Sequence, residues 1–438
     1  MTSLSDHVNR LVRSYWAVQG GSVVVGGIPI QAIADRFATP LFVYDAAVMD
    51  RKWSQLRDTF AERFAIYYSV KANPNRSILR HFLAKGSGLE IASGGELHQA
   101  IQAGCPPRKI LYAGPGKTES ELELALKQGI GEFHVESALE ARRISALCRR
   151  LGVTAYVALR INPSEAAQGG AMRMGGKPAP FGVDEEESVD LVRALEADSA
   201  IHFSGIHLFV GTQILDANVL LAQYRKGIEI ARRIAETIRR PLQTVDFGGG
   251  FGIPYFPQEH ELDLERLRDG IEQILDEVGK EELFDGTRFV IEPGRFLVGE
   301  AGLYVARVTD VKVSRGKTFV VLDGGMNHHL AASGNLGQVI KRNFPVAVLN
   351  KIDAPAREHV DVVGPLCTPL DTLARDISFP KVEVGDLIGV FQSGAYARTA
   401  SPLAFLSHRT PAEVLIEDGQ VREIRQRGTY EALCADMP

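Results

Sequence analysis

Residues Ile66–Asn75 read IYYSVKANPN, and this stretch decides how the rest of the chain is interpreted. Its Ile, Tyr and Val side chains favour a β-strand. Asn73-Pro74 ends that strand, because proline has no N–H for a ladder and restricts the residue before it. We therefore expect Lys71 at the C-terminal end of a buried strand, where burial lowers the pKa of the amine and makes it nucleophilic. The alternative is a lysine whose side chain extends from the strand end into solvent.

Seven more strand-like segments follow Ile66–Val70 at regular intervals. They are Leu89–Ala92, Ile110–Ala113, Phe133–Glu136, Ala155–Ile161, Phe203–Leu208, Thr244–Phe247 and Arg288–Ile291. Amphipathic segments typical of helices fill most gaps, for example Glu119–Gln128, Leu139–Leu151, Glu187–Glu196, Ala222–Arg239 and Leu264–Val278. Eight strand–helix units in about 250 residues predict a (β/α)8 barrel. An open doubly wound sheet, which usually has fewer strands, is the alternative.

The segments outside this barrel have a different pattern. Short β runs separated by Gly, Pro and Asp-Gly predict a β-rich C-terminal domain over residues 299–438, with the barrel over 37–298. Residues 1–36 predict an amphipathic helix and a hairpin at Gly26-Gly27, which we expect to join the β-rich domain. The Gly- and Ala-rich segment 164–180 is either a lid or binding loop, or a flexible insertion.

The composition is that of an ordinary globular protein. Of 438 residues, 45% are hydrophobic and 24% charged, and the net charge of -5 includes no basic block that would indicate nucleic acid binding. No apolar run approaches the ~18 residues of a membrane span, and the N-terminal segment lacks a signal-peptide core. The four cysteines are scattered, in neither a disulfide framework nor a metal-binding pattern, so we expect no metal and a cytoplasmic location.

Unusual residues follow several of the predicted strands, where a barrel carries its active site. Gly248-Gly249-Gly250 follows the seventh strand, and backbone N–H groups without side chains can converge on a phosphate. A tight turn is the alternative, although it rarely needs three glycines. Glu292 begins the EPGR segment after the eighth strand; a surface salt bridge is the alternative for this carboxylate. Thr212 and Tyr396 can add hydroxyl donors to the phosphate, and Gly294 is assigned to the cofactor site as well. Arg295 either adds positive charge at the phosphate or orients Glu292.

A lysine, a phosphate cradle and a buried carboxylate together indicate pyridoxal 5'-phosphate. Lys71 would bind the aldehyde covalently, the glycines the phosphate, and Glu292 the pyridine nitrogen. A carboxylate at that nitrogen keeps the ring protonated, which makes it a strong electron sink.

The chain resembles the fold-type III pyridoxal-phosphate decarboxylases, the group of diaminopimelate and ornithine/arginine decarboxylases. The resemblance covers roughly residues 35–430 and rests on YYSVKANPN, GLEIASGGEL, FGGGFG, EPGR, GPLCTPLD and QSGAY, in the family's order. It implies an alanine-racemase-like barrel followed by a β-domain. It also implies a homodimer, in which Cys367 and Tyr396 of one subunit complete the site around Lys71 of the other, and it makes Cys367 the candidate proton donor. Substrate contacts are assigned to Arg160, Thr368 and Asp371.

The departures from the family pattern concern the substrate. The LFVGTQ stretch places Phe209 on the cofactor ring where relatives have a histidine, and His207 lies two residues earlier. Thr368 follows Cys367, where enzymes for diamino acids have an acid, and MNHHLAAS over Met326–Ser333 lacks the arginine used for a distal carboxylate. A distal charge on the substrate without a partner in the pocket would weaken substrate binding by ~1–3 kcal/mol or more.

At these positions the chain resembles a narrower branch of the family. That branch includes a decarboxylase of carrier-linked glutamate in secondary metabolism and relatives found with exopolysaccharide gene sets. An amino acid, free or conjugated, is the expected small-molecule substrate, and an acyl-carrier protein is a possible partner. The alternatives are a diaminopimelate decarboxylase, an amino-acid racemase on the same fold, and a non-catalytic cofactor carrier. Racemases of this fold typically pair the pyridine nitrogen with arginine, and cofactor carriers are generally a bare barrel.

Overall fold

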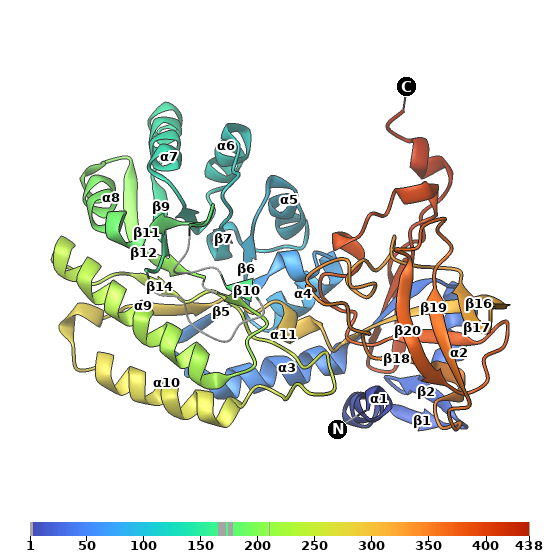
Figure 1. Ribbon diagram of the computed structural model, residues 1–438. Helices are drawn as coiled ribbons and strands as arrows, with labels where there is room; N and C mark the ends of the chain where they lie inside the picture. Colours follow the sequence, from blue (N-terminus) through green and yellow to red (C-terminus); the bar gives the residue numbers. More distant parts are fainter. Residues whose placement is uncertain (1–2, 165–171, 174–177, 210, 438) are drawn as a thin grey trace. The chain divides into compact units, whose positions relative to one another are not determined.

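The computed structural model describes residues 3–164, 172–173, 178–209 and 211–437. Most of the segment 164–180, expected as a lid or an insertion, therefore lies outside the described residues. The chain divides into two compact units (Figure 1). One contains Trp53–Ile253 and Glu261–Phe296, and the other contains Met1–Lys52, Pro254–His260 and Leu297–Pro438.

Eight parallel strands of the first unit close into a barrel, as the sequence predicts. Their order is β9-β12-β14-β15-β5-β6-β7-β8, and β8 pairs again with β9 through Phe133 and Val157. In chain order the strands are β5 (Phe64–Ser69), β6 (Gly88–Ile91), β7 (Ile110–Tyr112), β8 (Glu132–Val135), β9 (Ala155–Asn162), β12 (Ile201–Leu208), β14 (Thr244–Asp246) and β15 (Arg288–Ile291). Each lies within two residues of its predicted start.

Helices lie outside this ring of strands (Figure 1). They are α3 (Ala46–Thr59), α4 (Arg76–Ala84), α5 (Gly94–Gln102), α6 (Glu119–Gln128), α7 (Ala138–Leu151), α8 (Glu185–Ala197), α9 (Ala217–Ile238) and α10 (Leu264–Val278). Their ends follow local sequence signals. For example, α6 begins at a capping box between Thr118 and Glu121 and ends at Gly129, which has a left-handed conformation (φ 67°).

The barrel interior has an apolar layer and a polar layer. Tyr67, Leu111 and Val290 form an apolar cluster inside the ring, and Gly88 leaves room for the Tyr67 ring, which a Cβ there would approach to 2.2 Å. Side chains alternate between the two faces of a strand, so the residues two positions further along face the same interior. Those residues are Ser69, Glu292 and, on neighbouring strands, Glu90, His134, His207 and Asp246.

The second unit contains a sheet in the order β20-β19-β17-β16-β4-β22-β23, in which β18 and β21 pair with each other and β21 with β16. Its strands are β4 (Leu41–Asp45), β16 (Gly302–Ser314), β17 (Lys317–Leu322), β18 (Val346–Val348), β19 (Glu358–Val363), β20 (Thr372–Phe379), β21 (Leu387–Val390), β22 (Ala412–Glu417) and β23 (Gln420–Arg425). The β-rich C-terminal region that the sequence predicts is therefore present.

The N-terminal segment packs on this sheet. It forms α1 (Leu4–Tyr15), a small sheet of β1 (Ala17–Gln19), β2 (Ser22–Val25) and β3 (Ile28–Pro29), and α2 (Ile30–Phe37). Val8 and Leu11 of α1 share one hydrophobic core with Leu303 and Val414. Among the described helices, none has the length and hydrophobicity that a membrane span requires.

Candidate active site

Lys71 follows β5 in a single 3-10 turn, Val70–Ala72, because the strand ends at Ser69. This turn brings the lysine out of the strand, so 41% of its side chain is exposed and the burial that the sequence predicts is not found. The amine nevertheless forms an ion pair, because its Nζ lies 3.2 Å from Oε2 of Glu90 on the neighbouring strand β6. The turn also packs closely on the EPGR segment, since a Cβ on Gly294 would lie 2.9 Å from Cβ of Ala72.

Glu90 is a functional candidate that the sequence analysis did not identify. Its carboxylate is buried and accepts a hydrogen bond of 2.5 Å from the Ser69 hydroxyl as well as the ion pair with Lys71. Burial, followed by the negative charge of Glu90, raises the pKa of the nearby Glu96 to about 7. Glu90 is the single acid inside the apolar run of β6, and this position could have identified it from the sequence.

Phe209 directly follows β12, and two cations lie near its ring. Nζ of Lys71 is 5.7 Å from the centroid of its ring, and the guanidinium carbon of Arg160 is 5.9 Å from it. Arg160 is held by an ion pair of 2.8 Å with Glu136. Although burial by itself raises the pKa of Glu136, Arg160 and Lys117 bring it below its ordinary value. The structure thus brings together Lys71, Phe209 and Arg160, which the sequence predicted separately.

The glycine turn after β14 can accept a phosphate. A Cβ on Gly249 would lie 2.3 Å from the carbonyl oxygen of Glu292, and one on Gly248 would lie 2.5 Å from that of Leu208, so only glycine fits. Within the described residues, the amides of Gly249 and Gly250 donate to no protein acceptor. Two free N–H groups on a side-chain-free turn have the chemistry of an anion site.

Two other predicted phosphate contacts, Thr212 and Arg295, belong to the same unit and lie in short elements. Thr212 is in β13 (Gly211–Thr212), and Arg295 begins the short helix α11 (Arg295–Val298).

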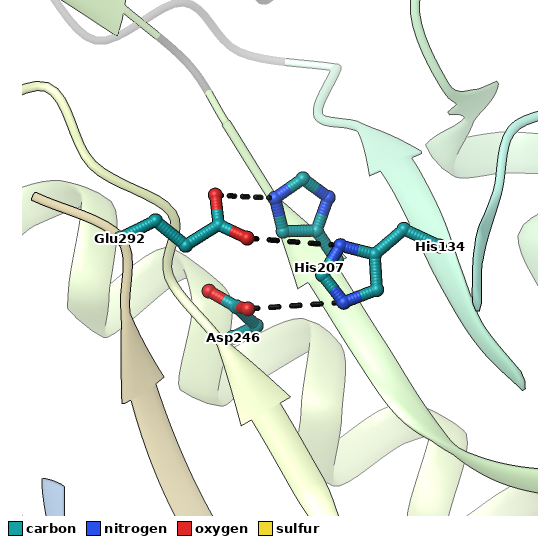
Figure 2. Close-up of side chains that lie close together, drawn as sticks. All are labelled: His134, His207, Asp246 and Glu292. Atoms are coloured by element: carbon teal, nitrogen blue, oxygen red, sulfur yellow. Dashed lines mark hydrogen bonds and ion pairs between the residues drawn. The ribbon is translucent and has the colours of Figure 1, made fainter. Parts of the chain in front are cut away.

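Glu292 lies at the end of β15 in a buried cluster with His134, His207 and Asp246, which Figure 2 shows. Its Oε2 is 3.4 Å from Nε2 of His207, and its Oε1 is 3.7 Å from Nδ1 of His134. Oε1 accepts no hydrogen bond from any N–H or hydroxyl group of the described residues. Burial and the charge of Glu292 raise the pKa of Asp246 well above its ordinary value.

From the sequence, His207 is not placed at the cofactor ring, and neither His134 nor Asp246 is predicted as a site residue. Each of these three residues is a single titratable side chain within or near the end of an apolar strand. That pattern in the sequence could have identified them as site candidates. They surround a carboxylate that was predicted.

The remaining predicted residues belong to the β-rich unit. Cys367 is exposed and carries a free thiol, Thr368 is partly exposed, and Tyr396 is partly exposed in a left-handed backbone conformation (φ 52°). Asp371 is buried, and its two oxygens accept hydrogen bonds from the amides of Met326 (2.7 Å) and Leu366 (2.9 Å). The roles assigned to these residues stay predictions.

The barrel residues fit pyridoxal phosphate on three observations. An amine is accessible at Lys71, the amides of Gly249 and Gly250 meet no acceptor among the described residues in a turn that only glycine can form, and one oxygen of the buried Glu292 carboxylate accepts no hydrogen bond from those residues. These groups lie at the ends of β5, β14 and β15, which are neighbours in the barrel.

Comparisons with known proteins agree with this chemistry. The family model for the pyridoxal-binding domain of pyridoxal-dependent decarboxylases matches residues 46–299. The chain is 38% identical over 412 residues to the L-glutamyl-(BtrI acyl-carrier protein) decarboxylase of Niallia circulans, covering 93% of this chain and 95% of that protein. It is 32% identical over 421 residues to the diaminopimelate decarboxylase of Aquifex aeolicus, covering 95% and 96%.

A solved structure agrees as well. The crystal structure of diaminopimelate decarboxylase from M. jannaschii superposes with a TM-score of 0.90 at 27% identity, and the match covers 98% of each chain. A lysine, a glycine turn and a carboxylate at neighbouring strand ends, together with these relatives, establish that the chain belongs to the pyridoxal-dependent decarboxylases, and that it is an enzyme whose cofactor is pyridoxal phosphate.

Proposed function

We propose that the enzyme removes the α-carboxyl group of an L-amino acid whose far end is conjugated, with a glutamyl thioester on a carrier protein as the first candidate. The relative from Niallia circulans, which is named for such a substrate, carries this proposal. Because the α-carboxyl leaves as carbon dioxide, it must be free in the substrate, so the carrier is attached through the side-chain carboxyl.

The residues around the far end support a substrate without a distal charge. Thr368 supplies a hydroxyl where enzymes for diamino acids have a carboxylate. Asp371, the nearest acid in sequence, uses both oxygens for backbone amides, and burial raises its pKa. Neither residue offers a free carboxylate to a distal ammonium group.

A cavity of about 400 Å³ in the β-rich unit supports an anionic attachment. Its lining includes Ser333, Lys341 and Arg375, with Phe256 and Leu373 among the apolar side chains. Arg342 also lines it, packed over the Phe256 ring and paired with Glu259 at 3.5 Å. Ser333 belongs to the segment that replaces the family's arginine stretch. A cationic and partly apolar cavity suits the phosphate-containing arm of a carrier protein.

The barrel residues have distinct roles in this proposal. Lys71 would hold the cofactor through its aldehyde, Gly249 and Gly250 would hold its phosphate, Glu292 would pair with its pyridine nitrogen, and Phe209 would pack on its ring. The cofactor, when bound, withdraws electrons from the α-carbon as carbon dioxide leaves. Further roles follow the family pattern: phosphate contacts for Thr212, Gly294, Arg295 and Tyr396, and substrate contacts for Arg160, Thr368 and Asp371.

Two parts of the proposal concern a second subunit. We assign the proton that replaces the carboxyl group to the thiol of Cys367. That thiol would come, with Tyr396, from the partner in a homodimer. The exposure of Cys367 is compatible with this role, because a proton donor to substrate must be accessible.

The test is carbon dioxide release by the full chain from a panel of amino acids. The panel contains free glutamate, ornithine, lysine and meso-diaminopimelate, the small thioester of glutamate with N-acetylcysteamine, and glutamate on a carrier protein. We expect the thioesters to react and the free diamino acids to react poorly. Rapid turnover of free meso-diaminopimelate would instead assign the enzyme to diaminopimelate decarboxylation. Racemisation of the α-carbon without release of carbon dioxide would indicate a racemase.

A further inference from the structure

The carboxylate of Glu292 has an unusual support in the barrel interior. Two imidazoles, His134 from β8 and His207 from β12, stack with their centroids 4.2 Å apart and their planes 19° apart. Figure 2 shows both rings directed toward the carboxylates of Glu292 and Asp246. All four side chains are buried, with Glu292 the most exposed at 4%. A buried polar group without a hydrogen-bond partner lowers the stability of the folded state, so the partners of these four side chains decide whether the cluster is stable.

His207 acts on one oxygen of Glu292. Burial, and then the neighbouring His134, lower the pKa of His207 well below its ordinary value, so this imidazole is neutral. Its Nδ1 has no hydrogen-bond partner among the described residues, whereas Nε2 lies 3.4 Å from Oε2 of Glu292. The single proton of the ring therefore belongs on Nε2, where it is donated to the carboxylate.

His134 acts through Glu132 and through the ring of His207. Its Nε2 is 3.2 Å from Oε1 of Glu132 and 3.8 Å from Oδ2 of Asp246, while its Nδ1 is 3.7 Å from Oε1 of Glu292. The Nε2 contact with Glu132 is a hydrogen bond, whereas Nδ1 has no hydrogen-bond partner among the described residues. His134 is thus anchored through Glu132, and its ring stacks on the His207 imidazole that contacts Glu292.

We infer that His134 and His207 are positioning residues for Glu292. His207 holds Oε2 of Glu292, and His134, hydrogen-bonded to Glu132, holds the His207 ring by stacking on it. The inference rests on the proposed role of Glu292 at the pyridine nitrogen of the cofactor. It adds that two imidazoles fix the orientation of this carboxylate beside two other acids, Asp246 and Glu132.

Two imidazoles and two carboxylates can also bind a divalent cation. A single ion takes only one nitrogen of an imidazole, however. Nε2 of His134 is hydrogen-bonded to Glu132, which leaves only Nδ1 of this ring for an ion. Metal content is therefore one outcome of the test.

The test is a double-mutant cycle in the full chain. His134→Gln and His207→Gln are made alone and in the Glu292→Gln background. The cofactor is removed and titrated back, and its affinity and visible absorption are followed; kcat and KM are measured with the N-acetylcysteamine thioester of glutamate. His202→Gln is the matched control, because His202 lies on the same strand β12 but packs on Tyr156, with ring centroids 4.8 Å apart.

We expect each single histidine variant to weaken cofactor binding or lower kcat by about 10- to 100-fold, as losses of supporting hydrogen bonds do, with a changed absorption spectrum and KM nearly unchanged. In the Glu292→Gln background the same changes should have little further effect, because their target is gone. His202→Gln should behave like the unchanged protein.

Three results would overturn the inference. Equal losses in both backgrounds would assign the histidines to general stability. Unaffected single variants, beside a damaging Glu292→Gln, would show that Glu292 needs no such support. One equivalent of metal in the cofactor-free protein would assign the cluster to a cation. If Glu292→Gln itself changes nothing, the proposed role of Glu292 fails, which is a separate result.

Discussion

The ion pair between Lys71 and Glu90 determines the position of the lysine amine. Its amine is accessible from solvent, yet Glu90, buried and bonded to Ser69, holds it near the end of β5. An accessible amine with a fixed position suits a residue that must react with an incoming aldehyde. At the residue scale, the chemistry therefore depends on a charge pair between adjacent strands.

The first prediction concerns the attachment of the cofactor. The purified protein should absorb visible light, and borohydride reduction should fix the cofactor to the peptide that contains Lys71, as peptide mass mapping can show. Lys71→Ala should abolish this labelling. Lys117, which is buried and paired with Glu140 at 2.6 Å, is the internal comparison and should stay unlabelled. Labelling of another lysine would refute the assignment.

The second prediction concerns Glu96 and pH. Its pKa is raised from 4.5 to about 7, by burial and then by Glu90. The folded protein binds this proton more tightly than the unfolded chain, so the stabilising contribution is fully present below about pH 4.5 and is lost as the pH rises through 7. Glu96→Gln, which never ionises, should therefore raise the thermal midpoint at pH 8, by about 2–4 °C for each kcal/mol recovered.

Thermal melts at pH 5 and pH 8 check this prediction. At pH 5 the Glu96→Gln variant should differ little from the unchanged protein. Glu272→Gln, an exposed position on α10, is the control and should have little effect at either pH. An equal stabilisation by Glu96→Gln at both pH values would show that ionisation of Glu96 is not the cause.

At the scale of elements, the barrel places its reactive groups through strand alternation. Residues at every second position of a parallel strand face the interior, so single polar residues near the ends of β5, β6, β8, β12, β14 and β15 meet there. The turns after these strands are equally constrained. Gly249 packs so closely on the Glu292 carbonyl that no larger residue fits.

The third prediction tests that turn. Gly249→Ala would place a Cβ 2.3 Å from the backbone oxygen of Glu292, so the turn or the EPGR segment must move. We expect cofactor affinity to fall by about tenfold or more, a loss of about 1.4 kcal/mol. Titration of the cofactor-free protein measures it. Gly116→Ala, at the same end of the barrel, is the control, because a Cβ there meets nothing within 4 Å. Equal affinities for the two variants would contradict the prediction.

At the scale of the whole molecule, the proposal assigns site residues to both units of each chain. The fourth prediction tests whether the proposed homodimer shares its sites between subunits. Lys71→Ala and Cys367→Ala should each lose most activity, whereas a mixture of the two chains, unfolded and refolded together, should regain about a quarter of the original activity, because half of the dimers then carry one intact site. Activity measurements and sedimentation check this. A dimer without recovery would mean that each site lies within one chain.

The fifth prediction concerns the far end of the substrate. Thr368→Glu introduces a negative charge, which should lower kcat/KM for a glutamyl thioester because the new charge lacks a partner. The same change should raise the weak activity on free ornithine or lysine, since charge complementarity sets specificity by difference. Thr368→Gln, similar in size but neutral, is the control. Wild-type turnover of free meso-diaminopimelate with a kcat/KM of ~10⁴–10⁸ M⁻¹s⁻¹, usual for natural substrates, would contradict the proposed substrate class.

The sequence by itself determined the barrel, the β-rich region that follows it and the identity of the cofactor. Strand periodicity, glycine turns and the residues at strand ends are local signals, and eight repeats of them leave few other folds. Lys71, the glycine turn and Glu292 could each be identified because a short motif marks them.

Only the tertiary structure decided which side chains surround those residues. Glu90, His134 and Asp246 lie on strands far apart in the chain, and a contact across a barrel depends on strand order and register, which no local pattern encodes. The same applies to the exposure of Lys71, which follows from one 3-10 turn after β5. A buried charge is set by all its neighbours at once, so the support of Glu292 by two histidines became visible only when β8, β12, β14 and β15 were placed around it.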